Sequence, residues 1–406
     1  MRIAFIVGTP PKKLGSLEQW VLGVCAEALR RGHTLDLFTL LPVHPVLQQE
    51  LDRLGVGFGS IESLRAAPVA AARRLASYDL IYANMLPPRS QVAFSCYAAW
   101  PAPLVFVEHC GDIHTPVAPL RRFLSRALDQ VTLRRVNELV GVSEYVRGRD
   151  VERFGLEARR TRVIHNGVDP SRFTTEKTPN PTGALRMICV SQLIPEKGID
   201  VLLRAMTLTR AQDCTLRVVG YGRMEEPYKA LVRELKLEKR VEFLGMRDDV
   251  HLLLRDAEVC VHTPTLEEAF GLAVTEGMVS GCGVIATRSG GIPEIIDDGV
   301  NGLLVPKGDA ATLAKAIDTL AFDPALRARL GAEGRRKVER AFTLSRCISE
   351  HVDCMEQVAS ERRGVPVRPR PVPVPEAAVR PAFGVSGVPA QVGTQGVPAN
   401  AVSPQG

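Results

Sequence analysis

Short runs of apolar residues alternate along the chain with longer stretches in which apolar positions recur every three to four residues. The runs have the length of buried strands, and the stretches have helical periodicity, so the chain predicts an α/β fold with parallel strands. The predicted strands are residues 3–7, 34–40, 78–83, 104–108, 139–143, 162–164, 185–190, 216–219, 241–244, 259–262 and 284–287. The predicted helices include residues 16–31, 120–136, 144–154, 199–206, 249–255, 272–279, 310–320, 324–341 and 344–360.

Length and composition divide this pattern into two domains and a tail. The 406 residues, 45% of them hydrophobic, suffice for about two α/β domains with full cores. A proline-rich linker is predicted at residues 174–183, between domains of residues 1–173 and 184–343. Residues 364–406 contain nine of the 29 prolines and three Gly-Val-Pro repeats. This composition predicts a disordered tail, although its Val-Pro alternation could also bind a partner.

One stretch, residues 257–306, concentrates the candidate chemistry. The strand at residues 259–262 ends at a Thr-Pro break, a loop carries Glu268, and the following helix carries Glu276. Ligands bind at the carboxyl ends of strands in open α/β sheets, so both glutamates belong at one such edge. The backbone amides at the start of this helix suit an anionic phosphate, whereas carboxylates suit sugar or ribose hydroxyls. The predicted amide donors are Phe270, Gly271 and Leu272.

The first domain has its own glycine loop, residues 8–15, which follows the first strand and leads into a helix. Such a loop is a ready anion site, with Gly15 and Ser16 at the helix start. It lacks the G-x-G-x-x-G dinucleotide fingerprint, and a tight turn without a ligand is the alternative. Ser16 with Gln19 predicts a capping box. His109 lies just past the strand at residues 104–108, where a side chain can project into a cleft; an isolated histidine is more often structural.

Several motifs in the second half occur together. They are Glu268-Ala269-Phe270-Gly271-Leu272-Ala273-Val274-Thr275-Glu276, Gly281-x-Gly283-Val284-Ile285, Gly290-Gly291-x-Pro293-Glu294 and Asn301-Gly302-Leu303-Leu304-Val305. In combination they resemble the paired-glutamate signature of the retaining glycosyltransferases of family 4. The resemblance covers roughly residues 1–360. It implies the GT-B fold, with two Rossmann-like doubly wound domains facing a central cleft and a last helix that returns to the first domain.

The resemblance also implies an activity and residue roles. Such an enzyme, a hexosyltransferase, transfers a sugar from a nucleotide-diphosphate donor to a carbohydrate or lipid-linked acceptor, with retained configuration and without a cofactor or an essential metal. Lys197 matches the family's lysine on the donor diphosphate, and Glu268 matches the glutamate that binds the donor sugar's hydroxyls, so the resemblance implies that both are catalytic residues, together with His109. The arginine expected beside that lysine is replaced by Gln192, which can donate hydrogen bonds but carries no charge. The remaining implied donor contacts are His109 to the sugar, Glu276 to the ribose, Gly15 and Ser16 to the phosphates, and Arg247 in the loop beside the base.

Charge and cysteine content exclude other classes. The net charge is +6, of which the tail supplies +2, and this is too weak to indicate nucleic-acid binding. Nine cysteines without a C-x-x-C spacing predict reduced thiols in the cytoplasm and no cysteine-bound metal. A targeting segment is not predicted, nor is an 18-residue apolar run. The arginine-rich helix at residues 120–136 favours a solvated face, with peripheral contact to the inner membrane as the alternative.

The expected activity is therefore transfer from a nucleotide sugar, with UDP-sugars favoured, in polysaccharide or glycolipid synthesis. Two other functions remain open. A nucleotide-sugar epimerase of the same fold would use the same donor site, although the Glu268 motif argues against it. A non-catalytic nucleotide-sugar-binding protein would tolerate Gln192 in place of arginine.

Overall fold

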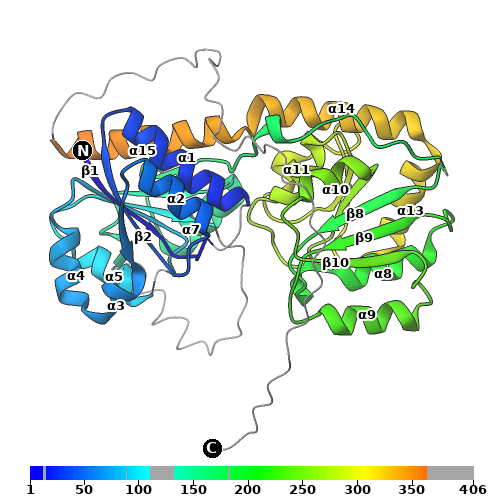
Figure 1. Ribbon diagram of the computed structural model, residues 1–406, viewed down its shortest axis with the longest axis horizontal. Coiled ribbons are helices and arrows are strands. Elements are labelled where there is room, and N and C mark those ends of the chain that lie inside the picture. The colour runs from blue at the N-terminus through cyan, green and yellow to red at the C-terminus, as the bar shows by residue number, and fades with distance from the viewer. Residues whose placement is uncertain (12–14, 88, 110–131, 182, 364–406) are drawn as a thin grey trace, which may run out of the picture. The chain divides into compact units, whose positions relative to one another are not determined.

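The computed structural model describes residues 1–11, 15–87, 89–109, 132–181 and 183–363. These residues belong to one compact unit, Met1–Pro366, that contains two parallel sheets (Figure 1). The expected helix at residues 120–136 lies outside the described residues except for its last five positions. The expected tail lies wholly outside them.

The first sheet has seven strands in the order β3-β2-β1-β4-β5-β6-β7, and every neighbouring pair is parallel. The strands are β1 (Arg2–Val7), β2 (Thr34–Thr39), β3 (Gly57–Ser60), β4 (Leu80–Asn84), β5 (Leu104–Glu108), β6 (Glu138–Gly141) and β7 (Thr161–Val163). The associated helices are α1 (Ser16–Arg30), α2 (Pro45–Arg53), α3 (Ile61–Ala66), α4 (Pro68–Leu75), α5 (Gln91–Ala98) and α7 (Glu144–Phe154), with a 3₁₀ turn at Ala158–Arg160.

The second sheet has six parallel strands in the order β10-β9-β8-β11-β12-β13. The strands are β8 (Arg186–Val190), β9 (Thr215–Val219), β10 (Val241–Gly245), β11 (Val259–His262), β12 (Gly283–Thr287) and β13 (Leu303–Val305). The helices are α8 (Ile199–Leu208), α9 (Glu225–Glu234), α10 (Val250–Asp256), α11 (Leu272–Val279), α12 (Ile292–Ile295), α13 (Ala310–Phe322), α14 (Pro324–Ala341) and α15 (Leu344–Arg363), with 3₁₀ turns at Pro170–Arg172 and Pro195–Lys197.

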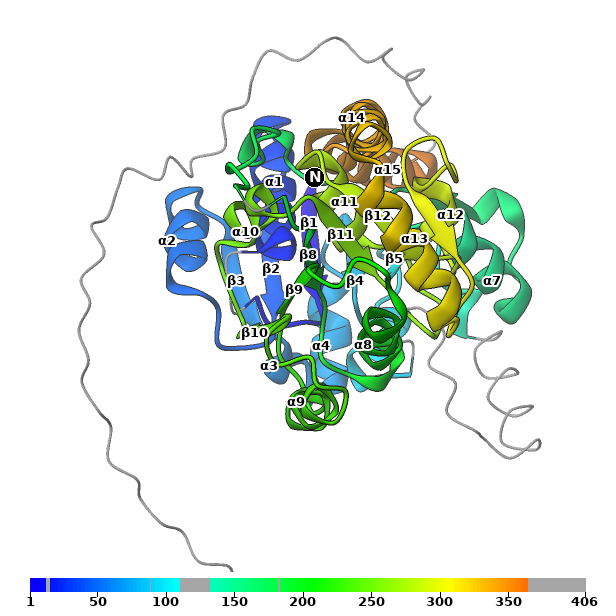
Figure 2. The same ribbon diagram turned by 90° about the vertical axis from the view of Figure 1, so that its right-hand side faces the viewer.

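Alternating side chains of the first sheet build two cores, one on each face. Phe5 and Tyr82 belong to the core beneath α1 and α15, whereas Ile6 and Phe106 belong to the core beneath α3, α4 and α5. This follows from strand geometry, in which successive side chains point to opposite faces. The helix α15 packs on the first sheet beside α1. The helix that precedes it in the chain, α14, packs on α11 of the second sheet, so the chain returns to the first sheet at its last helix (Figures 1 and 2).

One expectation from the sequence needs correction. The helix α1 is capped not by Ser16 but by Gly15, whose backbone amide donates to the Glu18 carboxylate at 2.9 Å. This arrangement leaves the Ser16 hydroxyl available for another partner.

A close approach between two loops explains the glycine that follows β9. A Cβ at Gly220, where φ is +141°, would lie 1.8 Å from the carbonyl oxygen of Ser191, so any side chain at this position would collide with the neighbouring loop.

Candidate functional site

The site begins where β8 and β11, neighbours in the second sheet, both end. Lys197 closes the 3₁₀ turn after β8, and Glu268 lies in the loop after β11. The Lys197 ammonium donates to a Glu268 carboxylate oxygen at 2.5 Å. Loop-to-loop hydrogen bonds fix this approach, since the Thr265 amide donates to the Glu196 carbonyl at 2.9 Å. The structure thus brings together two residues that the sequence analysis assigned to one site.

His262 adds a third group that the sequence analysis missed. It is the last residue of β11, its side chain is buried, and its Nε2 lies 3.2 Å from the Glu268 carboxylate. Burial alone would raise the pKa of Glu268, but the hydrogen bond and charge of His262, together with Lys197, lower it to about 2. Glu268 is therefore a carboxylate throughout the neutral range. The available signal in the sequence was a histidine ending a buried strand, six positions before this glutamate.

The glycine pair after β12 holds the backbone of Glu268. The Glu268 amide donates to the Ser289 hydroxyl at 3.0 Å, and its carbonyl accepts from the Gly291 amide at 2.9 Å. A Cβ at Gly290 would lie 2.0 Å from the Glu268 carbonyl oxygen, and φ there is +49°. Glycine is required because any side chain would collide with the loop that presents the carboxylate.

The next element, α11, starts immediately beyond this loop. Gly271 is its N-cap residue with φ +110°, and Leu272 is its first helical residue. The Phe270 side chain is buried against the rings of His165 and Phe342, so Phe270 can contribute to a ligand site only through its backbone. The amides at this helix start carry the partial positive charge that suits a phosphate.

Glu276, one turn into α11, meets an element of the first sheet's half of the chain. The Ser16 hydroxyl donates to its carboxylate at 2.7 Å. Ser16 is the first residue of α1, so the start of α1 and the helix α11 face each other. The structure therefore brings Gly15, Ser16 and Glu276 together, and their contacts with a donor remain a prediction.

His109 follows directly after β5 and lies beside α1. Its ring centroid lies 6.3 Å from that of Trp20, which is one helical turn beyond Ser16 on the same helix. Burial lowers the pKa of His109 to about 4, so the imidazole is neutral at neutral pH. Its Nε2 is buried and has no hydrogen-bond partner among the described residues. A ligand hydroxyl would satisfy this nitrogen, but the expected contact with a sugar remains a prediction.

The other two predicted donor contacts lie at the periphery. Gln192 is exposed in the loop after β8. Arg247, in the loop after β10, forms a two-pronged ion pair with Asp249 at 2.6 and 2.8 Å. The described contacts thus tie Arg247 to its own loop and do not join it to Lys197 or Glu268.

A second connection between the two halves surrounds Glu294 on α12. Its carboxylate accepts from the backbone amides of Glu144 and Tyr145 at the start of α7, both at 2.9 Å, and from His165 Nε2 at 2.9 Å. Nearby, the Ser143 hydroxyl donates to the Ala269 carbonyl at 2.6 Å. Burial alone would raise the pKa of Glu294, but His165 and the two amides lower it. The sequence analysis recognised Glu294 only as part of a motif.

Two solved structures share this fold. The chain resembles a glycosyltransferase from Rickettsia africae, with a TM-score of 0.74 at 20% identity over 88% of this chain and 98% of that one. It also resembles HepE of Anabaena, crystallised with UDP and glucose, with a TM-score of 0.71 at 23% identity over 88% and 100%. These likenesses confirm the GT-B glycosyltransferase fold predicted from the sequence.

Two family models match consecutive parts of the chain. Glycosyltransferase Family 4 matches residues 17–172, and Glycosyl transferases group 1 matches residues 171–337. The chain belongs to glycosyltransferase family 4, as its motifs predicted. The putative glycosyltransferase EpsD of Bacillus subtilis is 33% identical over 58% of this chain and 62% of its own length. The D-inositol 3-phosphate glycosyltransferase of Corynebacterium efficiens is 26% identical over 82% and 87%. The expectation of an enzyme of the hexosyltransferase class is consistent with these relatives.

Proposed function

We propose that the protein transfers a sugar from a nucleoside diphosphate donor to an acceptor hydroxyl with retained anomeric configuration. Membership of the family implies a nucleotide-sugar donor and an acceptor. The observation that carries the finer proposal is the Lys197–Glu268 ion pair beside the start of α11, with Glu276 close to the glycine loop of the first sheet. A site that combines a cation, backbone amides and carboxylates suits a phosphorylated carbohydrate better than a simple anion, because the carboxylates can accept hydrogen bonds from its hydroxyls.

Each group has a distinct role in this proposal. The donor diphosphate takes the Lys197 ammonium, with Gln192 and the amides of residues 270–272 as further donors. As the bond to the sugar breaks, negative charge grows on the diphosphate, and these preorganised groups stabilise it. Glu276 binds ribose hydroxyls, Glu268 binds the sugar, and the neutral His109 binds it from the opposite wall. The acceptor oxygen then attacks from the side of the leaving group, and the departing phosphate takes its proton.

The choice of donor and acceptor class rests on similarity. A UDP-sugar is favoured, in agreement with the UDP bound to HepE. Synthesis of a polysaccharide or glycolipid is favoured, in agreement with relatives named for colanic acid and amylovoran biosynthesis. For a lipid-linked acceptor, we place the enzyme in the cytoplasm, at the inner face of the membrane. Among the described helices, none is long and apolar enough to cross a bilayer.

The proposal is tested in two steps. A thermal-shift screen with UDP-, GDP- and ADP-sugars identifies the donor, because a ligand that binds only the folded state raises the melting temperature. The selected donor is then incubated with candidate acceptors, and release of the nucleoside diphosphate is measured together with the anomeric configuration of the product. An isomerised donor without acceptor would instead identify an epimerase. Stabilisation without any turnover would identify a binding protein.

A further inference from the structure

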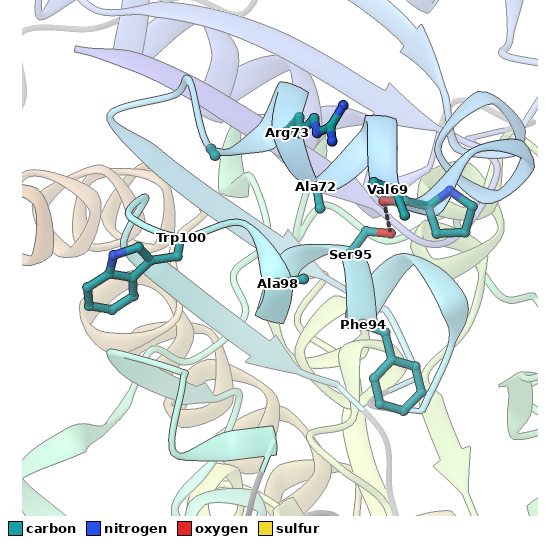
Figure 3. Close-up of a pocket in the computed structure, with 9 residues that line it drawn as sticks. Val69, Ala72, Arg73, Phe94, Ser95, Ala98 and Trp100 are labelled. Atoms are coloured by element: carbon teal, nitrogen blue, oxygen red, sulfur yellow. Dashed lines mark hydrogen bonds between the residues drawn. The ribbon is translucent and has the colours of Figure 1, made fainter.

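The helices α4 and α5 meet in a hollow on the outer side of the first sheet's helical layer. Its cavity has a volume of about 460 Å³ and is lined mainly by apolar side chains (Figure 3). Both helices pack on the core of Ile6 and Phe106, the sheet face opposite to the one that carries α1 and α15. The hollow is therefore separate from the candidate donor site, which lies beside the start of α1.

Large apolar side chains stand exposed around this hollow. Val69 on α4 is 68% exposed, Phe94 on α5 is 38% exposed, and Trp100 in the turn after α5 is 69% exposed. Figure 3 shows all three around the same pair of helices. Single exposed apolar residues are common on soluble proteins, but a cluster around an apolar hollow marks an interaction surface.

The position of Trp100 is fixed by Arg135. The guanidinium lies over the indole ring, 4.9 Å from its centroid, and donates to the carbonyl oxygens of Ala99 and Ala102 at 3.5 and 2.7 Å. The turn that carries Trp100 is thus tied to its neighbouring segment, and the indole is presented outward. A tryptophan paired with an arginine suits the boundary between lipid tails and headgroups, because each has an apolar body and a polar or charged end.

The segment that builds the hollow carries more basic than acidic residues. Within residues 61–103, the arginines Arg65, Arg73, Arg74 and Arg89 outnumber the two acids, Glu62 and Asp79. All four arginines are exposed, and Arg73 lines the hollow itself. Both acids have partners nearby: Asp79 accepts from the Arg2 amide at 2.8 Å, and Glu62 accepts from the Ser60 hydroxyl at 2.5 Å. The net positive charge complements an anionic surface.

We propose that this α4–α5 face docks on the surface of an anionic phospholipid bilayer. Trp100, Phe94 and Val69 would enter the boundary of the acyl chains, and Arg73 would bind lipid phosphates. The inference rests on the membrane-side part of the proposed function and assigns the surface that makes the contact. Docking would bring the enzyme to the membrane surface, where the head group of a lipid-linked acceptor lies. It requires no assumption about the donor.

The test uses the full chain and vesicles, without substrate. Vesicles of phosphatidylcholine alone are compared with vesicles of phosphatidylcholine and phosphatidylglycerol, and binding is measured by co-sedimentation. Tryptophan fluorescence gives a second readout, because the chain has two tryptophans and the other one, Trp20, is buried in the core. We expect co-sedimentation and a blue shift of the emission only with the anionic vesicles. High salt should weaken the binding.

Matched variants locate the contact. Arg73→Glu changes the charge by two, and at about a fivefold effect per charge it should weaken partitioning about 25-fold. Trp100→Ala should weaken it about tenfold and abolish the blue shift. The controls are Arg204→Glu on α8 and Phe322→Ala on α13. Phe322 is 59% exposed beneath Arg210, the same arrangement as Trp100 beneath Arg135. Both controls should bind like the wild type.

Three results would overturn the inference. The chain could fail to bind anionic vesicles, it could bind both vesicle types equally, or the α4–α5 variants could bind as well as their controls. Dissociation of a dimer by Trp100→Ala, without any vesicle binding, would assign the face to a second copy of the chain instead. Because no result depends on turnover, loss of this inference would leave the proposed transfer reaction intact, and the reverse also holds.

Discussion

The Lys197 ammonium lies 2.5 Å from the Glu268 carboxylate, although the two residues are 71 positions apart in the chain. They meet because β8 and β11 are neighbours in the second sheet, so the loops after these strands share an edge. Each side chain neutralises the charge of the other. If Lys197 binds the donor diphosphate as proposed, the diphosphate competes with Glu268 for the ammonium, and donor binding frees Glu268 to contact the sugar.

Replacing Lys197 should impair the chemical step more than folding. We expect Lys197→Ala to lower kcat/KM by about 2–4 kcal/mol in transition-state free energy, or about 30- to 800-fold, since one preorganised donor to the leaving group is lost. Steady-state kinetics with the identified donor checks this. Lys229→Ala is the control, because that lysine pairs with Glu225 on the surface of α9. Wild-type turnover in Lys197→Ala would contradict the proposed role.

Glu276 and Ser16 should respond differently to removal. Glu276→Ala should raise the transition-state free energy reflected in kcat/KM by about 2–4 kcal/mol, by analogy with the removal of one preorganised donor to a transition state. Ser16→Ala should cost less than about fivefold, since its hydrogen bond to Glu276 at 2.7 Å is exchanged for ribose hydroxyls when the donor binds. The double variant, Ser16→Ala with Glu276→Ala, tests whether the two residues contribute to activity independently. If both single variants and the double variant lose the same activity, the two residues act as one unit and the exchange is wrong.

The parts of this site that could be predicted are those with strong periodic or turn signals. The strand β11 and the helix α11 begin and end close to the predicted residues, because the apolar run and the Gly271 start are unambiguous. Adjacency of Lys197 and Glu268 followed from the family resemblance together with the rule that loops at strand ends share an edge. The short elements of residues 41–77 and 84–103 were not predicted. For example, β3 has only four residues, Gly57–Ser60, two of them glycine, at the margin of the sheet.

The side-chain contacts of Ser16, His262 and Arg247 could not be predicted from the sequence. Ser16 had an expected local role in capping α1, but Glu18 takes that role and Ser16 turns to Glu276. His262 has no motif of its own, and its value depends on Glu268 lying within hydrogen-bond distance. Arg247 had a local competitor two positions away, Asp249, which it binds with both prongs. In each case the choice among several feasible partners is made by packing, which periodicity does not encode.

Asp150 should make stability depend on pH. Its carboxylate on α7 is fully buried, 2.8 Å from the Arg149 guanidinium. Burial, assisted by the charge of Glu108, outweighs the effect of Arg149 and raises the pKa of Asp150 to about 7, compared with about 4 in the unfolded chain. The folded state thus binds the proton more tightly than the unfolded chain. The resulting contribution to the unfolding free energy is complete below pH 4 and is lost as pH rises through 7.

The neutral variant Asp150→Asn isolates this effect. Between pH 5 and pH 8, the difference in unfolding free energy should shift in favour of the variant by roughly 2–3 kcal/mol, because only the wild type must ionise a buried acid. Denaturant unfolding of both proteins at the two pH values measures the shift. A difference that does not change with pH would show that Asp150 is not protonated in the folded protein at pH 5.

Glu294 should be a main stabiliser of the contact between α12 and α7. It accepts three hydrogen bonds at 2.9 Å, two from the amides that open α7 and one from His165. We expect Glu294→Ala to lower the unfolding free energy by about 2–4 kcal/mol, since hydrogen bonds to a charged group contribute about 1.5–3 kcal/mol each and are partly replaced by water. Denaturant titration measures the loss.

Two comparisons make that prediction specific. Glu144→Ala removes a neighbouring carboxylate that pairs with Arg147 at the surface, and it should change stability by less than about 0.5 kcal/mol. The pKa of Glu294 is lowered in the folded protein, so its contribution is present above the unfolded pKa and is lost as pH falls. The difference in unfolding free energy between wild type and Glu294→Ala should therefore become smaller at acidic pH. If wild type and Glu294→Ala are equally stable at neutral pH, then other contacts, such as the hydrogen bond from Ser143 to the Ala269 carbonyl, suffice to hold α7 in place.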